Sequence, residues 1–249
     1  MAVHKPVARA RRRLLNASVR HRSRVARWLL GGHASISFSQ EGEDRVLNRL
    51  LEREGPGFYV DVGAHDPRRF SNTYLLYLAG WRGIAVDPHH STAEAFRQIR
   101  PRDVFLETAV GTVAGNHPYF EFNDSALNTL SRARADNLVE STDYVLVRES
   151  TVPVQRLDWL LSEHLPPGQQ IGVMSVDTEG ADEDVLTSND WDCYRPRFVI
   201  VEILGLTSLI GVEASGAGRR LMDNGYVPFA KALNSVFFAD RSSDGAPRL

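Results

Sequence analysis

Two carboxylates that each end a short apolar run are the residues of this chain best placed for chemistry. Asp61 follows Phe58-Tyr59-Val60, and Asp87 follows Ile84-Ala85-Val86 after a gap of helical length. A continuous apolar run of this length is typical of a strand buried on both faces, as in a parallel sheet covered by helices. Because ligands bind beyond the carboxyl ends of such strands, we expect Asp61 and Asp87 to reach one crevice.

The turn after the first run limits the kind of ligand. Gly63 is its only glycine, so the chain lacks the G-x-G-x-x-G pattern that lets a pyrophosphate approach the backbone. A nucleoside ligand without a pyrophosphate fits better, and S-adenosylmethionine is the favoured candidate. Asp87 would accept both ribose hydroxyls; the alternative role for Asp87 is to cap the following helix.

The methionine end of the same ligand needs an anion beside its ammonium and donors beside its carboxylate. Asp61 and the backbone of Gly63 and Ala64 are expected to face the ammonium. Asn72 and Thr73 lie at the expected start of the next helix, where N–H groups bind anions, and are expected to bind the carboxylate.

Further acids follow the later apolar runs. Asp177 and Glu179 come after Met174-Ser175-Val176, and Glu202 ends the fifth run. Asp177 or Glu179 would act as a general base or orient an acceptor hydroxyl. Alternatively, Asp177 and Glu202 would together hold Mg²⁺, which prefers oxygen ligands. His65 is a further candidate base because histidine titrates near neutral pH, or it is an ordinary hydrogen-bonding loop residue.

These residues need a scaffold of strands and helices to position them. Apolar runs and turn signals predict strands at 58–62, 83–87, 103–110, 171–177 and 197–204, and a closing antiparallel hairpin of 226–231 and 234–239. The expected helices are 41–54, 72–79, 91–99, 156–164, 181–187 and 216–224. Alternating strands and helices predict one doubly wound α/β domain.

Residues 123–150 show no clear period and are expected to be an irregular loop, preceded by a local hairpin around 119–122. A loop of this length inside a domain is usually functional. Its polar side chains would grip a hydroxyl-rich acceptor, and they are Asn123, Asp124, Asn128, Arg132, Arg134 and Tyr144.

Charge is distributed unevenly along the 249 residues. Residues 1–40 hold nine Lys or Arg and no acid, so the rest has 29 − 9 = 20 basic against 31 acidic residues, a net charge of −11. The apolar cluster at 28–30 is too short for a signal peptide. The basic arm, residues 1–35, would either fold onto the acidic body or meet an anionic membrane or polyanion; nucleic acid is not the expected partner.

The remaining composition points to a cytoplasmic enzyme. Cys193 is the single cysteine, so an intrachain disulfide is impossible. No apolar run approaches the ~20 residues that span a bilayer. Neither feature predicts the oligomeric state.

Five blocks taken together resemble the FkbM methyltransferases over about residues 36–240. They are Ser39-Gln40-Glu41-Gly42-Glu43-Asp44, Asp61-Val62-Gly63-Ala64-His65-Asp66-Pro67, Ser71-Asn72-Thr73-Tyr74-Leu75, Gly80-Trp81-Arg82-Gly83 and Val176-Asp177-Thr178-Glu179-Gly180-Ala181. The resemblance implies a class I methyltransferase fold, a Rossmann-like sheet of seven mostly parallel strands over residues 36–249. It also implies S-adenosylmethionine as cofactor and methyl transfer to a hydroxyl of a sugar or polyketide-type natural product.

The resemblance adds residues to the expected cofactor site. Gln40, with Glu41 and Asp44, should close over the cofactor, and Pro88 and Ala109 are assigned to it as well. Two other functions compete with methyl transfer. One is an NAD-dependent oxidoreductase of similar fold, which the missing glycines disfavour. The other is a non-enzymatic module that binds polyanions through the basic arm.

Overall fold

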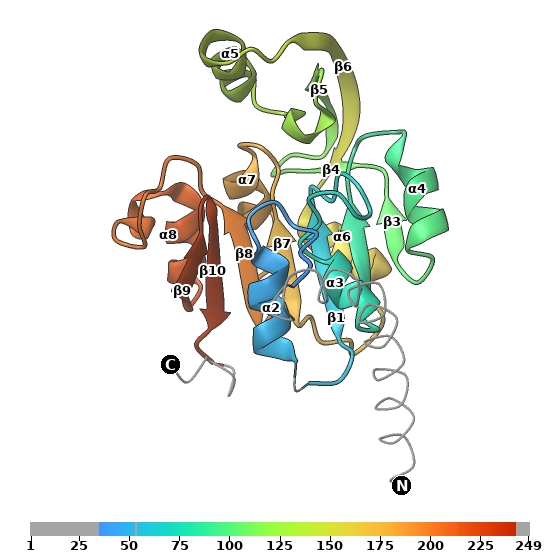
Figure 1. The fold of residues 1–249 in the computed structure, drawn as a ribbon, viewed down its shortest axis with the longest axis vertical. Helices are drawn as coiled ribbons and strands as arrows, with labels where there is room; N and C mark the ends of the chain where they lie inside the picture. Colours follow the sequence, from blue (N-terminus) through green and yellow to red (C-terminus); the bar gives the residue numbers. More distant parts are fainter. Residues whose placement is uncertain (1–34, 53, 243–249) are drawn as a thin grey trace, which may run out of the picture.

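A computed structural model describes residues 35–52 and 54–242 of the chain. Within these residues the main sheet has seven strands (Figure 1). In spatial order they are β3 (Val104–Leu106), β2 (Arg82–Val86), β1 (Phe58–Val62), β7 (Val173–Val176), β8 (Phe198–Glu202), β10 (Ser235–Asp240) and β9 (Tyr226–Ala232). The first five run parallel, and β10 pairs antiparallel with both β8 and β9. The class I methyltransferase fold with its C-terminal antiparallel hairpin is therefore confirmed.

Helices cover both faces of this sheet, because its strands are apolar on both sides. Alternate residues of β1 show the pattern: Val60 packs into one core cluster and Tyr59 into the other. The first cluster contains residues of α6 (Leu157–His164), α7 (Asp182–Thr187) and α8 (Gly216–Asp223). The other face is covered by α2 (Glu43–Leu51), α3 (Tyr74–Leu78) and α4 (Thr92–Ile99).

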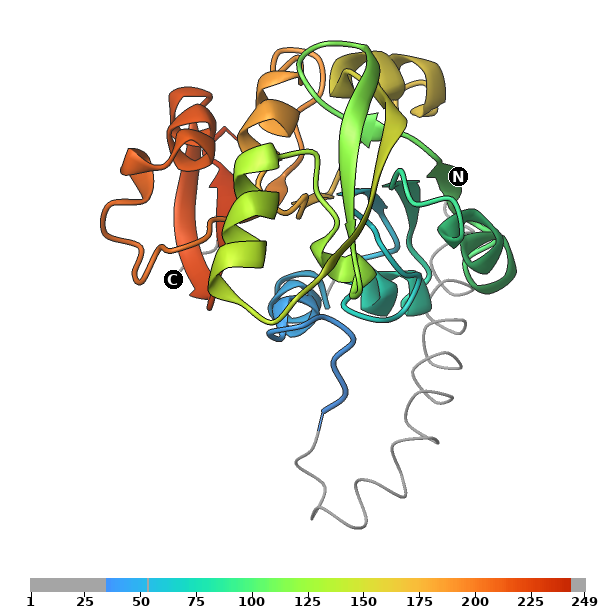
Figure 2. The ribbon, with the colours of Figure 1, turned by 90° about the horizontal axis from the view of Figure 1, so that it is seen from above.

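A second, smaller sheet stands over the carboxyl ends of the main strands. It consists of β4 (Ala109–Val110), β6 (Leu146–Gln155) and β5 (Gly115–Phe122), in that order. Between β5 and β6 lie the 3₁₀ helix η1 (Ser125–Leu127) and α5 (Arg132–Ser141). We call residues 115–155 the cap. Figure 2, a view from above, shows the cap lying across the top of the domain.

The expected loop at 123–150 is wrong, since this segment holds η1, α5 and the start of β6. Local hydrogen bonds explain why these helices form. The Asp124 side chain accepts from Ala126 N at the start of η1, and Ser131 Oγ accepts from Arg134 N at the start of α5. The local pairing expected at 119–122 is found only as one antiparallel bridge between Phe120 and Thr129, while β5 as a whole pairs with the more distant β6. The single strand expected at 103–110 is divided between β3 and β4, which belong to different sheets.

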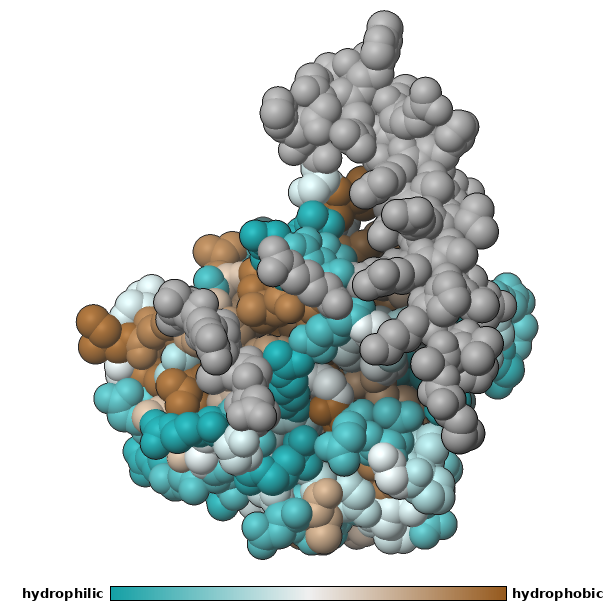
Figure 3. Space-filling view, turned by 90° about the horizontal axis from the view of Figure 1, so that it is seen from below, coloured by the Kyte–Doolittle hydropathy of each residue, from teal (hydrophilic) through white to brown (hydrophobic). Residues whose placement is uncertain are grey.

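The other expected helices and strands agree with the structure to within three residues at each end. The basic arm lies almost entirely outside the described residues, so its predicted contacts stay predictions. Among residues 35–52 and 54–242, every helix is too short or too polar to cross a membrane. Figure 3 shows the face opposite the cap, where the visible surface mixes hydrophilic and hydrophobic residues.

Candidate active site

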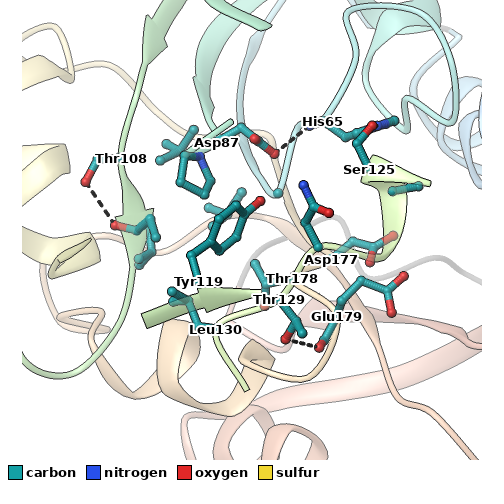
Figure 4. Close-up of a pocket in the computed structure, with 18 residues that line it drawn as sticks. His65, Asp87, Thr108, Tyr119, Ser125, Thr129, Leu130, Asp177, Thr178 and Glu179 are labelled. Atoms are coloured by element: carbon teal, nitrogen blue, oxygen red, sulfur yellow. Dashed lines mark hydrogen bonds between the residues drawn. The ribbon is translucent and has the colours of Figure 1, made fainter. Parts of the chain in front are cut away.

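A pocket separates the strand ends from the cap (Figure 4). Its empty space is about 510 Å³ when the open mouth is included. The strand ends contribute Val62, Gly63, His65, Val86, Asp87, Pro88, Asp177, Thr178 and Glu179. Residues 108–130 contribute Thr108, Ala109, Val110, Tyr119, Ser125, Ala126, Asn128, Thr129 and Leu130. The pocket lies where the strand order reverses, between β1 and β7, the usual ligand position in such sheets.

Asp87 leaves the sheet directly after β2 and is held in one orientation. Its Oδ2 accepts a hydrogen bond from His65 N at 2.8 Å, and its Oδ1 accepts one from His89 N at 2.9 Å. Burial raises the pKa of Asp87, and the two N–H groups oppose that rise. Both oxygens keep lone pairs for a ligand, and apolar Val62, Val86 and Ala109 surround them in the pocket wall.

His65 joins the first turn to the cap. Its Nε2 lies 2.9 Å from Ser125 Oγ, and its backbone has a φ of 45°, a left-handed value that is uncommon outside glycine. Burial lowers the pKa of His65, so the neutral ring is favoured at pH 7. Its buried Nδ1 has no hydrogen-bond partner among the described residues. A buried polar atom of this kind needs a partner, which a bound ligand would supply.

The acids at the ends of β7 and β8 lie close together. Asp177, Glu179 and Glu202 each offer a carboxylate oxygen, and these oxygens lie within 4.8 Å of one another. Burial, followed by repulsion from Glu202, raises the pKa of Asp177; burial, followed by repulsion from Glu179, raises the pKa of Glu202 to about 8. Glu202 Oε2 is buried without a hydrogen-bond partner among the described residues. The cluster therefore holds a proton at neutral pH unless a cation occupies it.

This shift predicts how stability depends on pH. The folded chain keeps the Glu202 proton up to pH 8, whereas the unfolded chain loses it near the ordinary pKa of 4.5. The contribution of this bound proton to the free energy of unfolding is therefore complete below pH 4.5 and is lost as the pH rises to 8. Thermal unfolding between pH 5 and 8 should show a falling midpoint in wild type and a flatter profile in Glu202→Gln. Parallel profiles would contradict the raised pKa.

Other residues predicted to bind the cofactor form hydrogen bonds with the protein itself. Asp61 is buried and accepts a hydrogen bond from Thr73 Oγ1, which itself accepts from Arg100 Nη2 at 2.9 Å. Asn72 Nδ2 donates to Ser175 Oγ at 3.0 Å. The backbone N–H groups of Gly63 and Ala64 both donate to Val86 O. Of these predicted residues, only Gly63 lines the pocket.

The residues predicted before and inside α2 form hydrogen bonds with neighbouring loops and do not line the pocket. Asp44 is buried and accepts hydrogen bonds from Ser37 Oγ, Phe38 N and Ser39 Oγ. Glu41 Oε2 accepts from Asn234 N at 2.9 Å, which fixes the turn between β9 and β10, and Gln40 is exposed. The structure thus brings together Gly63, His65, Asp87, Pro88, Ala109, Asn128, Asp177 and Glu179, and places the remaining predicted residues outside the pocket lining.

Tyr119 is a pocket residue that the sequence did not indicate. It lies on β5, is 5% exposed, and its ring stands in the middle of the pocket in Figure 4. Burial raises the pKa of its hydroxyl far above the usual value, so this group stays a hydrogen-bond donor. Only the polar character of the neighbouring region, which includes Asn128, hinted that this segment contacts ligands.

Residues 61–228 match the protein family described as the methyltransferase FkbM domain. They make up 168 of the 249 residues. The chain belongs to the FkbM methyltransferase family. It is therefore an S-adenosylmethionine-dependent methyltransferase, and the oxidoreductase alternative is dismissed. No curated protein matches this FkbM methyltransferase with a significant score.

Two solved methyltransferase structures are similar at low identity. A TehB-like SAM-dependent methyltransferase from Corynebacterium glutamicum is 12% identical, with a TM-score of 0.39, over 91% of this chain and all of that chain. A precorrin-6y C5,15-methyltransferase from Geobacter metallireducens is 11% identical, with a TM-score of 0.38, over 78% of this chain and 85% of that chain. The strand order described above, not these similarities, establishes the fold of the FkbM domain.

The pocket of this FkbM methyltransferase fits its cofactor. Asp87 offers oriented carboxylate oxygens for ribose hydroxyls, apolar residues beside it suit an adenine ring, and His65 Nδ1 awaits a polar partner. Asp177 and Glu179 line the same pocket at the end of β7. One pocket therefore joins an acid whose oxygens suit ribose hydroxyls to acids able to accept a proton.

Asp87→Ala should weaken S-adenosylmethionine binding by ~1–3 kcal/mol, the cost of losing a charged hydrogen-bond partner. Isothermal titration calorimetry would show this as a Kd increase of ~5–150-fold. Asp66→Ala is the matched control, because Asp66 also accepts two backbone N–H groups, those of Arg68 and Arg69, but does not line the pocket. An unchanged Kd in folded Asp87→Ala would remove Asp87 from the ribose role.

Proposed function

We propose that this enzyme transfers the methyl group of S-adenosylmethionine to a hydroxyl oxygen of a sugar or a polyketide-type natural product. The observation that carries the proposal is the shared pocket: Asp87 lies at one strand end, and Asp177 and Glu179 lie at another. Bound S-adenosylmethionine supplies an electrophilic methyl carbon. The protein then has to align the acceptor oxygen and remove its proton.

Asp177 is the proposed general base. Burial among acids raises its pKa, so in its ionised form Asp177 is a stronger proton acceptor than an exposed carboxylate. Glu179 would orient the acceptor hydroxyl through its carboxylate. His65 is the alternative base, but its lowered pKa makes it a weaker one.

Magnesium is a second way to use the same acids. Asp177, Glu179 and Glu202 together give an oxygen donor set of the kind that Mg²⁺ accepts. Asp177 and Glu202 would hold the ion, which would polarise the acceptor oxygen when bound. Chelation separates this version from the metal-independent base.

The proposed acceptor is a small molecule or an oligosaccharide. Polar cap residues support this proposal, because Ser125, Asn128 and Thr129 line the pocket beside the acids. The polyanion-binding alternative concerns the basic arm. Salt-sensitive retention on heparin or on vesicles of anionic lipid, lost after removal of residues 1–35, would support an added binding role for the arm.

The decisive experiment is a methyl-transfer screen with S-adenosylmethionine labelled in the methyl group. A panel of monosaccharides, a nucleotide-activated sugar and a hydroxylated macrolactone would be tested, and the methylated atom found by NMR. Labelled methyl ether in a product supports the proposal. Methylation at carbon or nitrogen, or binding of NAD in place of S-adenosylmethionine, would overturn it.

A further inference from the structure

Glu179 has a backbone conformation that its own residue type disfavours. Its φ is 53°, and that of the following Gly180 is 100°. Left-handed values in a residue with a side chain persist only where the surroundings fix them, and they gather at functional sites. The contacts that fix Glu179 are therefore informative.

Those contacts come from the cap. Thr129 Oγ1 donates to the backbone oxygen of Glu179 at 2.8 Å, the lower dashed line in Figure 4. Arg134 donates to Glu179 Oε2 from Nη2 at 2.8 Å and from Nε at 3.3 Å. A Cβ placed on Gly180 would lie 3.4 Å from Arg134 Cβ, so the stem of Arg134 packs beside the same turn.

Arg134 is itself held in place. It lies in the first turn of α5, where its N–H donates to Ser131 Oγ at 3.2 Å, and Ser131 N donates to Thr129 Oγ1 at 2.9 Å. The ion pair with Glu179 is largely protected from water, with 22% and 15% of the two side chains exposed. Both of its hydrogen bonds reach Oε2, which leaves Oε1 outside the ion pair.

We propose that Arg134 is a positioning residue that holds Glu179 in the acid cluster, so that the active site is complete only when the cap is closed. Without the guanidinium, repulsion from Asp177 and Glu202 would turn the Glu179 carboxylate toward solvent. This inference rests on the proposed role of Glu179 in orienting the acceptor.

A double-mutant cycle tests the proposal. Wild type, Arg134→Gln, Glu179→Gln and the double variant would be compared with the best acceptor of the panel above. We expect Arg134→Gln to lower kcat by ~10–100-fold, as for a misplaced catalytic group, with unchanged Kd for S-adenosylmethionine. The double variant should be no slower than Glu179→Gln, and Arg134→Lys should recover part of the loss, since lysine keeps the charge without the planar fork.

Arg97→Gln is the matched control. Arg97 lies on α4 and donates to Glu94 of the same helix at 2.7 and 3.0 Å, and neither residue lines the pocket. Its kcat should stay within about twofold of wild type, because its ion pair is exposed. This control separates the loss of one arginine charge from the loss of the Glu179 contact.

Each contrary outcome has its own meaning. A wild-type kcat in Arg134→Gln would overturn the positioning role. So would a double variant whose loss in kcat is the product of the two single losses, because the two residues would then act independently. If KM is raised as well in that case, Arg134 contacts the acceptor directly. Wild-type activity in Glu179→Gln would overturn both this inference and the proposed role of Glu179, but not methyl transfer itself. Independently of any acceptor, additive shifts of the unfolding midpoint across the four proteins would show that the ion pair is absent and overturn the proposal.

Discussion

Replacing Asp177 by Asn is expected to lower kcat by ~10²–10⁴, the usual contribution of a general base. The cofactor should still bind, because Asp87, at the end of a different strand, is untouched. The protein should also stay folded, since asparagine has the size and shape of aspartate and removes a charge that burial disfavours. Initial rates with the best acceptor, together with calorimetric Kd values, give the two measurements.

Chelation distinguishes the two roles of Asp177. If Asp177 and Glu202 hold Mg²⁺, EDTA should abolish wild-type activity and added Mg²⁺ should restore it. Full activity after exhaustive chelation would rule out the metal role and leave the base role. If Asp177→Asn and Glu179→Gln are both fully active, neither acid is the base, and His65 becomes the residue to test.

Gly63→Val should be the most damaging single change outside the acid cluster. Gly63 has a φ of 81°, and a Cβ placed on it would lie 1.7 Å from the backbone oxygen of Asp177. The obstacle is thus the end of β7 and not only the space of the cofactor. We expect the free energy of unfolding to fall by ~2–6 kcal/mol, from strained backbone and overpacking together, and S-adenosylmethionine binding to be lost.

Gly205→Val is the matched control for this change. Gly205 has a similar φ of 75°, but a Cβ placed there meets no atom within 4 Å. It should therefore show only the cost of backbone strain, ~1–3 kcal/mol, and retain cofactor binding. Chemical denaturation and calorimetry of both variants measure the difference. Equal effects at the two glycines would mean that the contact with Asp177 is unimportant.

The main sheet could be predicted from the sequence because its strands are buried on both faces. All five residues of β1 are buried, and four of them are apolar. The cap could not be predicted in the same way. In β6 only Val152 and Val154 are buried, with Pro153 between them, and in α5 only Ala135 and Leu138 are buried. Neither element therefore carries a strong apolar period.

Among the predicted acids, position relative to the strand end decides which ones reach the pocket. Asp87 comes after β2 and enters the pocket. Asp61 is still inside β1, where side chains alternate, so it shares a face with Tyr59 and joins the network of Arg100. Asp61 lies one residue before the end of β1 and Asp87 one residue after the end of β2. A difference of two residues thus decides between these outcomes, and sequence patterns do not fix strand ends that closely.

The cap is built so that it can separate from the sheet without unfolding it. Its apolar residues form two small clusters, one shared with β4, apart from the large clusters of the sheet. Its side-chain hydrogen bonds to the loops after β1, β2 and β7 are His65–Ser125, Arg69–Asp124, His90–Arg148, Thr129–Glu179 and Arg134–Glu179. Water can replace such bonds at little net cost. The cap should therefore behave as a separate cooperative unit, whose amide hydrogens exchange while those of the sheet remain protected.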